Sequence, residues 1–427
     1  MVYIHGDSYL WSSGNLYDGG VLASFGEVVV ITINYRLGLF GFLNPSVGPT
    51  QQVTNNGLLD QIAALHWIQQ NVEAFGGDPD KVTLFGHGSG AACISFLLNS
   101  PAAVTDLFHR AIVMSGSSLS SLAVVQDPAQ YALRLGVQVG CAESEDATTN
   151  SELLVDCLRE QSVERLLEAD VGGYQFLPTF GPSVDRVVVP ATVRRGARRN
   201  QGKVYSLMFG VAERDASNML ADDDLREGMT LDRRDRVLRS FVRNTHCYSN
   251  VEIFYSIINA YTEWGRARRG DKERRDETLA ALTDAVFVAP VTADADLHAP
   301  LEASPKDADP TFFYVFNRQK KGVTSDEVSR WGGGEGEVST NDYFSSLFLA
   351  IHQTCAWIRV MDPCAQWISK QTAGQIYDPN GSSVNFFLSW IYDLIGSDEK
   401  LRTWIYDLSG SHNAQHLKPG FQLFLYQ

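Results

Sequence analysis

The chain has 427 residues, of which 44% are hydrophobic and 20% are charged, and its formal net charge is −15. These values are typical of an ordinary globular protein with a sizeable buried core. The 50 acidic residues against 35 basic ones argue against nucleic acid as a partner, because its phosphates would be repelled, and they leave no polybasic patch for a membrane surface.

The first predicted elements are strands. Residues 1–5 and 28–35 are β-branched and apolar on both faces, which is typical of buried parallel strands. A helix is expected over 57–72, where apolar residues recur at helical spacing, and the Gly-Gly-Asp-Pro turn at 76–79 ends it. The chain begins directly in a strand, without a signal peptide, which suggests an incomplete sequence.

The same alternation continues along the chain. A strand over 81–85, a turn, a helix over 91–99 and a strand over 111–116 follow, with later strands at 204–210 and 312–316. This β-α-β order predicts an α/β fold with a doubly wound, mostly parallel sheet flanked by helices. No apolar run reaches the roughly eighteen residues that a membrane span needs.

Charged helices are expected in the middle of the chain. Residues 213–280 are rich in arginine and indicate solvated helices packed outside the sheet, and 331–339 is expected to be a flexible loop. No internal repeat and no domain boundary is evident, so the whole of 1–427 is predicted to be one domain.

Six cysteines do not make a disulfide scaffold. Cys141 and Cys157 flank an acidic segment, and a bond between them would close a short loop and suit an oxidising compartment. Two free thiols are the alternative that this spacing leaves open. Cys93 lies on the apolar helix and is expected to be a buried thiol.

The stretch VTLFGHGSGAA, residues 82–92, is similar to the strand–turn–helix on which a serine hydrolase presents its nucleophile. In the motif G-x-S-x-G, glycines lie two residues before and two after the nucleophile, because side chains there would clash. Gly86 and Gly90 occupy these places. The nucleophile position therefore falls on Gly88, which has no side chain to attack with.

A register shifted by one residue would use Ser89 as the nucleophile, but it puts His87 where a glycine is needed. The alternative is that Ser89 begins the helix and that its hydroxyl caps backbone N–H groups.

Long segments carry a resemblance to a known family. Residues 2–43 and 55–86 resemble the cholinesterase-like branch of the α/β hydrolases, and the segments AIVMSGSSLSSLAV, FGPSVDRVVVP and TLAALTDAVFVAPVTADADLHA are similar to those of neuroligins. Neuroligins are non-enzymatic synaptic adhesion proteins that bind neurexins. The resemblance covers residues 2–317 and is traceable to about 420, with a divergent tail after about 364.

The resemblance places the other members of the vestigial triad. Asp215 in GVAERDAS stands at the acid position, and Thr324 stands where the family's histidine would be. Without that histidine, a surface-loop carboxylate is the favoured interpretation of Asp215. His298, in DLHA, is expected to be structural.

The segment HGDSY replaces a glycine run that supplies oxyanion-binding N–H groups in active relatives. Asp7 and Ser8, with Ser89, therefore occupy the vestigial oxyanion positions, and the Asp7 carboxylate would repel a developing oxyanion. Departures at three distant places predict a catalytically inactive site. No metal or cofactor motif is found in the sequence.

The resemblance implies a neurexin-like cell-surface partner, bound through acidic and apolar loops with a bridging calcium ion. The candidate contacts are Glu213, Asp215 and Asn218, each of which is otherwise an ordinary loop residue. It also implies a postsynaptic cell-surface location and a homodimer whose first helix would be 341–363. Asn380, in Asn-Gly-Ser, is the expected glycosylation site.

The missing leading strands and last helix of the family put dimerisation in doubt and predict a marginally stable chain that tends to associate. Two functions other than adhesion remain open. One is a carboxylic ester hydrolase that uses Ser89, and the other is a fragment without function.

Overall fold

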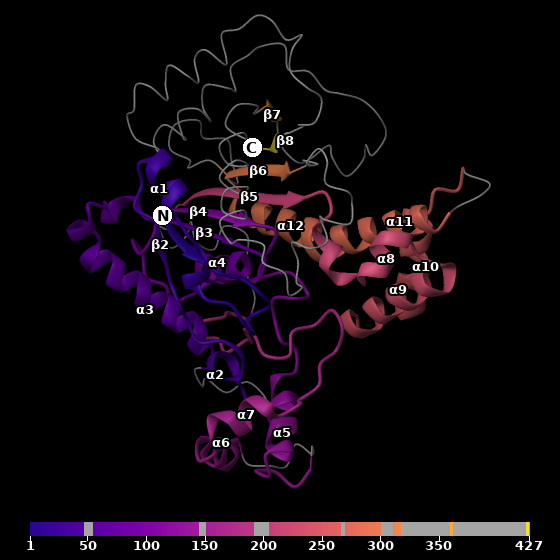
Figure 1. Cartoon of the computed structure of the whole chain (residues 1–427), viewed down its shortest axis with the longest axis horizontal. Helices are drawn as coiled ribbons and strands as arrows, with labels where there is room; N and C mark the ends of the chain where they lie inside the picture. The colour runs from indigo at the N-terminus through magenta and orange to yellow at the C-terminus, as the bar shows by residue number, and fades with distance from the viewer. Residues whose placement is uncertain are drawn as a thin grey trace, which may run out of the picture.

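A central sheet organises the part of the chain that the computed structural model describes, namely residues 1–46, 54–144, 151–191, 205–265, 270–299 and 311–316, with the backbone of two short strands at 359–361 and 424–426. Its strand order is β2-β1-β3-β4-β5-β6-β8-β7 (Figure 1). The strands are β1 Val2–Ile4, β2 Ile31–Thr32, β3 Thr83–His87, β4 Arg110–Met114, β5 Ser206–Ala212, β6 Thr311–Phe316, β7 Arg359–Met361 and β8 Phe424–Tyr426.

Every neighbouring pair is parallel except β6 and β8, which are antiparallel. The predicted α/β fold with a mostly parallel sheet is confirmed. Because the strands are parallel, the loops that follow β1, β3, β4 and β5 all leave the sheet at its carboxyl edge, where open α/β sheets place their ligands.

The second strand is much shorter than the predicted 28–35. Only Ile31 and Thr32 pair with β1, opposite Val2 and Tyr3. β1 itself has three residues, which limits the regular ladder, although the Met1 amino group also donates to the Val29 carbonyl and the Ile33 N–H donates to the Tyr3 carbonyl.

Helices connect and cover the strands. They are α1 Gly20–Gly26, α2 Gly38–Phe42, α3 Asn56–Asn71, α4 Ser89–Asn99, α5 Pro128–Gln138, α6 Ser151–Arg159, α7 Val163–Glu168, α8 Asp222–Glu227, α9 Leu231–Thr245, α10 Asn250–Tyr261, α11 Asp271–Thr283 and α12 Ala289–His298. The predicted helix over 57–72 is α3, which buries Leu58, Leu65 and Ile68 and is followed by a short 3₁₀ segment that ends at Gly76, with φ +81°.

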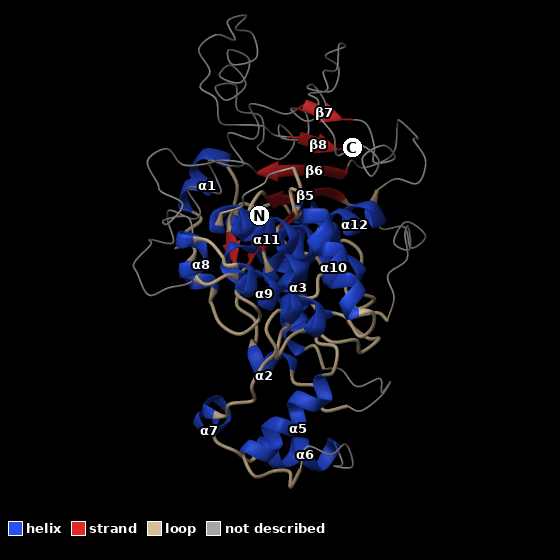
Figure 2. Ribbon diagram, turned by 90° about the vertical axis from the view of Figure 1, so that its right-hand side faces the viewer, coloured by secondary structure: helices blue, strands red, loops and turns tan. Residues whose placement is uncertain are grey.

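The charged middle of the chain forms a helical unit beside the sheet (Figure 1). Helices α8 to α11 enclose a second apolar core that includes Val237, Leu238, Phe241 and Leu282. The prediction of helices is confirmed, but these helices are not merely solvated, since α9, α10 and α11 contribute buried apolar side chains to this core and α8 packs Leu225 against it. A third, smaller cluster lies in the unit of α5, α6 and α7, which projects from one end of the molecule in both views (Figure 2).

The longest helical segment runs from Asp271 to His298 and is interrupted by a π-helical turn, Asp284–Val288. Pro290 accounts for the interruption, because its ring conflicts with the carbonyl four residues earlier. That carbonyl, of Val286, instead accepts a hydrogen bond from Ser120 Oγ at 2.8 Å. This segment is long and apolar enough to cross a membrane, but most of it is buried within the fold, as a core helix is.

The predicted helix over 341–363 does not extend to its end. Arg359–Met361 form β7, which pairs in parallel with β8. Pairing with a distant segment has overridden the local helical period there. The remainder of 341–363 and the predicted loop at 331–339 lie outside the described residues.

Candidate functional site

The turn between β3 and α4 has the conformation of a nucleophile elbow. β3 ends at His87, Gly88 has φ +57° and ψ −122°, and α4 begins at Ser89. The Gly88 N–H donates to the Met114 carbonyl of β4 at 3.0 Å, and the Gly88 carbonyl accepts from the N–H of Ala92 at 3.0 Å. The predicted strand–turn–helix is therefore present, with a glycine at the left-handed position.

Close backbone approach explains the two flanking glycines. A Cβ on Gly90 would lie 2.1 Å from the Ile4 carbonyl oxygen of β1, and one on Gly86 would lie 2.8 Å from the Gly90 carbonyl carbon. A Cβ on Gly88 would meet no atom of the described residues within 4 Å. The turn thus forbids side chains at the two flanking positions and leaves room for one at position 88, where the chain has none.

Ser89 does not cap the helix, contrary to the prediction. Gly88 is the N-cap residue, and no side chain makes a capping hydrogen bond there. The Ser89 hydroxyl oxygen is buried and has no hydrogen-bond partner among the described residues. Ser89 is the first residue inside the helix rather than its N-cap, so its position adjacent to the turn did not predict its contacts. No described base contacts this hydroxyl.

Of the two histidines near this turn, His5 is buried and His87 is partly buried. His87 lies at the end of β3, and burial lowers the pKa of its ring to about 4. The His5 ring stacks on Tyr35 with centroids 4.5 Å apart, and burial lowers its pKa, opposed by the Gly6 carbonyl and Asp7. Both rings are therefore neutral near pH 7.

The loop after β1 occupies the predicted oxyanion positions in a strained form. Asp7, Ser8 and Tyr9 have φ of +72°, +58° and +63°, a region that L-residues rarely adopt. The Asp7 carboxylate accepts a hydrogen bond from the Tyr17 hydroxyl at 3.5 Å. Burial raises the pKa of Asp7, and hydrogen bonds from Ser12 and Tyr17 oppose that rise.

Asp215 carries a partly buried carboxylate that joins two strand ends. Its Oδ1 accepts from the Ser115 hydroxyl at 2.9 Å and its Oδ2 accepts from the Ala212 N–H at 2.8 Å. Burial raises the pKa of Asp215 to about 6, against these two hydrogen bonds. The interpretation of Asp215 as a surface-loop carboxylate is therefore wrong, because a 3₁₀ turn over Asp215–Met219 directs its side chain inward.

The other two candidate partner contacts differ from Asp215 in their exposure to solvent. Glu213 and Asn218 are exposed on the same loop, and no hydrogen bond or ion pair of their side chains is found among the described residues. Between them, Arg214 forms an ion pair with Asp276 of α11 at 3.5 Å. The loop thus presents one carboxylate and one amide to solvent while Asp215 and Arg214 fix it to the fold.

A second buried network joins side chains that are distant in the sequence. Asp294 of α12 is fully buried, and its Oδ2 accepts from Ser95 Oγ of α4 at 2.5 Å and from Ser117 Oγ at 2.9 Å. His298 Nε2 lies 3.6 Å from the other oxygen of Asp294, which agrees with a structural role for this histidine. Ser115 and Ser117 belong to the segment SGSSLSS. Its place directly after a buried strand, at the carboxyl edge, was the signal available.

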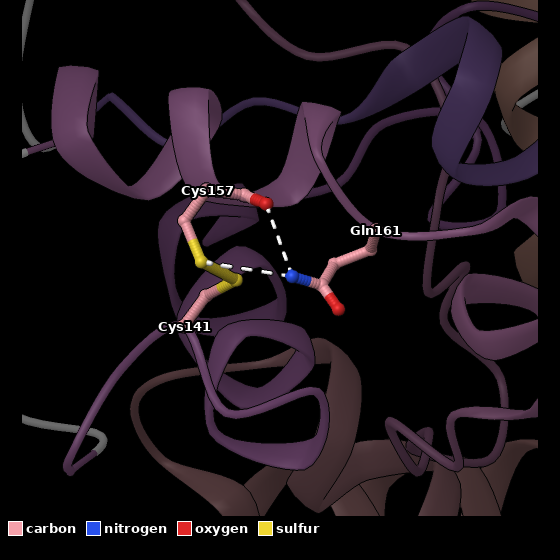
Figure 3. Close-up of a disulfide and its surroundings, with 3 residues drawn as sticks. All are labelled: Cys141, Cys157 and Gln161. Atoms are coloured by element: carbon pink, nitrogen blue, oxygen red, sulfur yellow. Dashed lines mark hydrogen bonds between the residues drawn. A yellow bond between two sulfur atoms is a disulfide. The ribbon is translucent and has the colours of Figure 1, made fainter.

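The disulfide between Cys141 and Cys157 is formed, and Cys93 is a buried thiol, as predicted (Figure 3). The Gln161 side-chain N–H₂ donates to the Cys157 carbonyl at 3.3 Å. Thr324 and Asn380 lie outside the described residues, so their roles stay predictions.

Comparison with known proteins defines the class. Residues 1–350 match the model of the carboxylesterase family, and the chain belongs to that family. Within it, the chain resembles neuroligins. It is 40% identical to Neuroligin-3 of Mus musculus over 320 residues, which cover 74% of this chain and 37% of that protein. It is 38% identical to Neuroligin-2 of Mus musculus over 320 residues, 74% of this chain and 36% of the relative.

A more distant relative gives the same picture. Over 349 residues the chain is 34% identical to Neuroligin-1 of Caenorhabditis elegans, covering 79% of this chain and 43% of that protein. The chain spans less than half the length of the curated relatives it matches.

Proposed function

We propose that this chain is a catalytically inactive carboxylesterase-family domain that acts in cell adhesion at the cell surface by binding a neurexin-like protein. The observation that carries the proposal is Gly88. It has a positive φ and lies between two glycines that cannot accept a side chain, and it has no side chain to act as nucleophile although no described atom lies within 4 Å of where its Cβ would be. The identity to neuroligins supports the adhesive role.

The environment of Ser89 argues against the hydrolase alternative. Its hydroxyl is buried and has no partner among the described residues, whereas a serine nucleophile needs a base within hydrogen-bond reach. His87, its neighbour, is partly buried, and burial lowers the pKa of its ring to about 4.

Glu213 and Asn218 are the proposed contacts with the partner, and Asp215 holds their loop to β4 through Ser115. Calcium prefers six to eight oxygen ligands. Among the described residues no group of three or more His, Cys, Asp or Glu side chains could hold a metal. A bridging calcium ion would therefore take the Glu213 carboxylate from this chain and most of its ligands from the partner and from water.

Two further features support the location and assembly that we propose. The Cys141–Cys157 disulfide suits an extracellular compartment. Tyr248, Val251 and Tyr255, on or just before α10, are 74%, 58% and 59% exposed, and the last two lie one helical turn apart. A homodimer would bury this apolar face.

The test uses the chain as a secreted protein and a neurexin laminin-G-type domain as the probe. Binding is measured by calorimetry with calcium and then with a chelator, and hydrolysis of a nitrophenyl ester is measured on the same sample. Calcium-dependent binding without hydrolysis is expected. Hydrolysis that Ser89→Ala abolishes would contradict the proposal, and so would the absence of binding.

The assigned loop has its own test. Glu213→Arg replaces a carboxylate with a cation and should weaken binding at least tenfold, because a like charge then faces the calcium ion or a basic partner. Asp156→Arg is the matched control, since Asp156 is an exposed carboxylate on α6, far along the chain from the loop. Equal affinity of Glu213→Arg and the wild type would show that the contact surface lies elsewhere.

A further inference from the structure

The π-helical turn Asp284–Val288 is a junction at which three separate elements meet. Turns of this kind hold fewer than about 1% of the residues of globular proteins and are frequent at functional sites. Because the turn is a local exception inside an α-helical segment, its hydrogen bonds can also shift to the α-helical pattern, which gives it two discrete arrangements. Contacts that favour one arrangement over the other can therefore act on each other through this turn.

Two of these elements are the ends of neighbouring strands of the sheet. Ser120 Oγ, in the segment after β4, donates to the Val286 carbonyl within the turn at 2.8 Å. The Ala216 N–H, in the 3₁₀ turn after β5, donates to Oγ1 of Thr283, the residue before the π-helical turn, at 3.3 Å. Both strand ends are therefore fixed to the same turn.

The two strand ends are also joined to each other, and one of them is strained. Ser115 Oγ donates to Asp215 Oδ1 at 2.9 Å, which links the segment after β4 to the 3₁₀ turn after β5. Ser115 has φ +52°, a region that L-residues rarely adopt and that persists only where the surrounding structure enforces it. The conformation of this edge therefore depends on the bonds around it, including those to the π-helical turn.

The third element is α10, which meets the turn through one hydrogen bond and through packing. The hydroxyl of Tyr261, the last residue of α10, donates to Asp284 Oδ2 at 2.7 Å. Burial and the Asp284 carboxylate raise the pKa of Tyr261, so its phenol remains a donor at neutral pH. Phe254 of α10 and Val286 of the turn belong to the same apolar core. A change in the position or mobility of α10 therefore acts directly on the turn.

We infer that the π-helical turn couples α10 to the ends of β4 and β5, so that covering the exposed face of α10 slows the local opening of residues 115–120 and 215–219. The inference rests on the proposed function for what covers α10, namely a second copy of this chain. It adds that dimerisation changes the mobility of the sheet edge, although none of these edge residues is on α10. Coupling between two sites is reciprocal, so loosening the strand ends should also weaken the dimer.

Hydrogen exchange followed by mass spectrometry tests the coupling on the full chain. Amides of 115–120 and 215–219 should exchange at least about fivefold more slowly in the wild-type dimer than in the Tyr255→Glu monomer. Tyr261→Phe keeps the ring but removes the bond to Asp284, so it should still dimerise at high concentration while losing this slowing. Tyr174→Phe is the matched control, because it also removes one hydroxyl, which accepts from Arg134 of α5 at 3.4 Å, and it should keep the slowing. Sedimentation confirms the oligomeric state of each variant and thermal melting confirms that it is folded.

The outcomes separate the inference from the proposed function. Equal exchange in the wild-type dimer and the Tyr255→Glu monomer would overturn the coupling and leave the homodimer standing. Slowing that survives in a Tyr261→Phe dimer would overturn the assignment of the π-helical turn as the connection. If the wild type sediments as a monomer, the proposed homodimer falls, and the coupling is tested within the monomer. Tyr261→Phe should then still speed the exchange of 115–120 at least about fivefold, and unchanged exchange would overturn the inference.

Discussion

The carboxyl group of Asp215 lies between the ends of β4 and β5 and has lost most of its contact with water. Its pKa is raised to about 6, so the folded chain holds the proton more tightly than the unfolded chain, in which an aspartate titrates near 3.9. Its contribution to stability is therefore fully present below about pH 4 and is lost as the pH rises through about 6.

This pH dependence should disappear in Asp215→Asn. The amide can accept from the Ala212 N–H and donate to Ser115 Oγ, so the two hydrogen bonds survive without a buried charge. Above pH 7 the variant should be more stable than the wild type by on the order of 1–3 kcal/mol. Urea unfolding between pH 4 and 8 measures the difference. Asp276→Asn, at a half-exposed ion pair, is the control, and parallel profiles for Asp215→Asn and the wild type would disprove the assignment.

The elbow glycines should differ sharply in their tolerance of alanine. Gly90→Ala places a Cβ 2.1 Å from the Ile4 carbonyl oxygen and requires α4 to move off β1, so it should cost at least about 3 kcal/mol or prevent folding. Gly88→Ala meets no atom within 4 Å and carries only the strain of a positive φ, roughly 1–2 kcal/mol. Chemical denaturation of Gly90→Ala and Gly88→Ala measures the free energy of unfolding that each variant loses. Equal costs would mean that the elbow is not packed as described.

Sequence motifs predicted where the turn residues lie in the fold, but they did not predict which groups surround each side chain. Gly86, Gly88 and Gly90 could be placed from their spacing, because the backbone turn is local. The inward orientation of Asp215 and the unpartnered hydroxyl of Ser89 could not, because they depend on Ser115 and on packing from β1. The Asp294 network joins residues 199 and 177 positions apart, and no local pattern records such contacts.

The disulfide closes the unit of α5 and α6 and should account for much of its stability. Cys141 and Cys157 are 16 positions apart, and closing a loop of this size is worth about 3 kcal/mol in the chain-entropy model. Cys141→Ser with Cys157→Ser should lower the Tm and expose α6 to hydrogen exchange before the sheet exchanges. Cys247→Ser, which removes an exposed free thiol, is the control. Unchanged exchange in α6 would show that packing alone maintains this unit.

The elements that could be predicted were those with a strong local period. Helix α3 and strands β3 to β6 follow from apolar spacing and β-branched runs. The short β2 and the strand at 359–361 could not be predicted, because their lengths are set by partners elsewhere in the chain. The π-helical turn could not be predicted from Pro290 alone, because it also depends on the hydroxyl of Ser120, which is distant in the sequence and bonds to the Val286 carbonyl.

At the scale of the whole molecule, the proposed partner-binding edge of the sheet and the proposed dimer face lie on different elements. The carboxyl edge of the sheet carries the loops after β1, β4 and β5, while α10 belongs to the helical unit beside the sheet (Figure 1). On that unit, the Arg239 guanidinium lies 3.9 Å from the centroid of the Phe254 ring and 6.0 Å from that of Tyr255. An adhesion protein arranged in this way could bind a partner and a second copy of itself at the same time.

The dimer can be tested independently of the partner. Tyr255→Glu or Val251→Glu places a charge on the exposed face of α10 and should shift the sedimenting species from dimer to monomer without lowering the Tm. Leu153→Glu, at a 67% exposed position on α6, should leave the dimer intact. A wild type that sediments as a monomer at micromolar concentration would contradict the proposed homodimer.

Gly88 also determines how this protein can be detected. Fluorophosphonate reagents report serine hydrolases by forming a covalent bond to the elbow serine oxygen, and a glycine there offers them no atom to attach to. A census of carboxylesterase-family proteins that relies on such labelling would omit this chain at any abundance. Its presence in a tissue must be detected by mass spectrometry of its peptides or with antibodies.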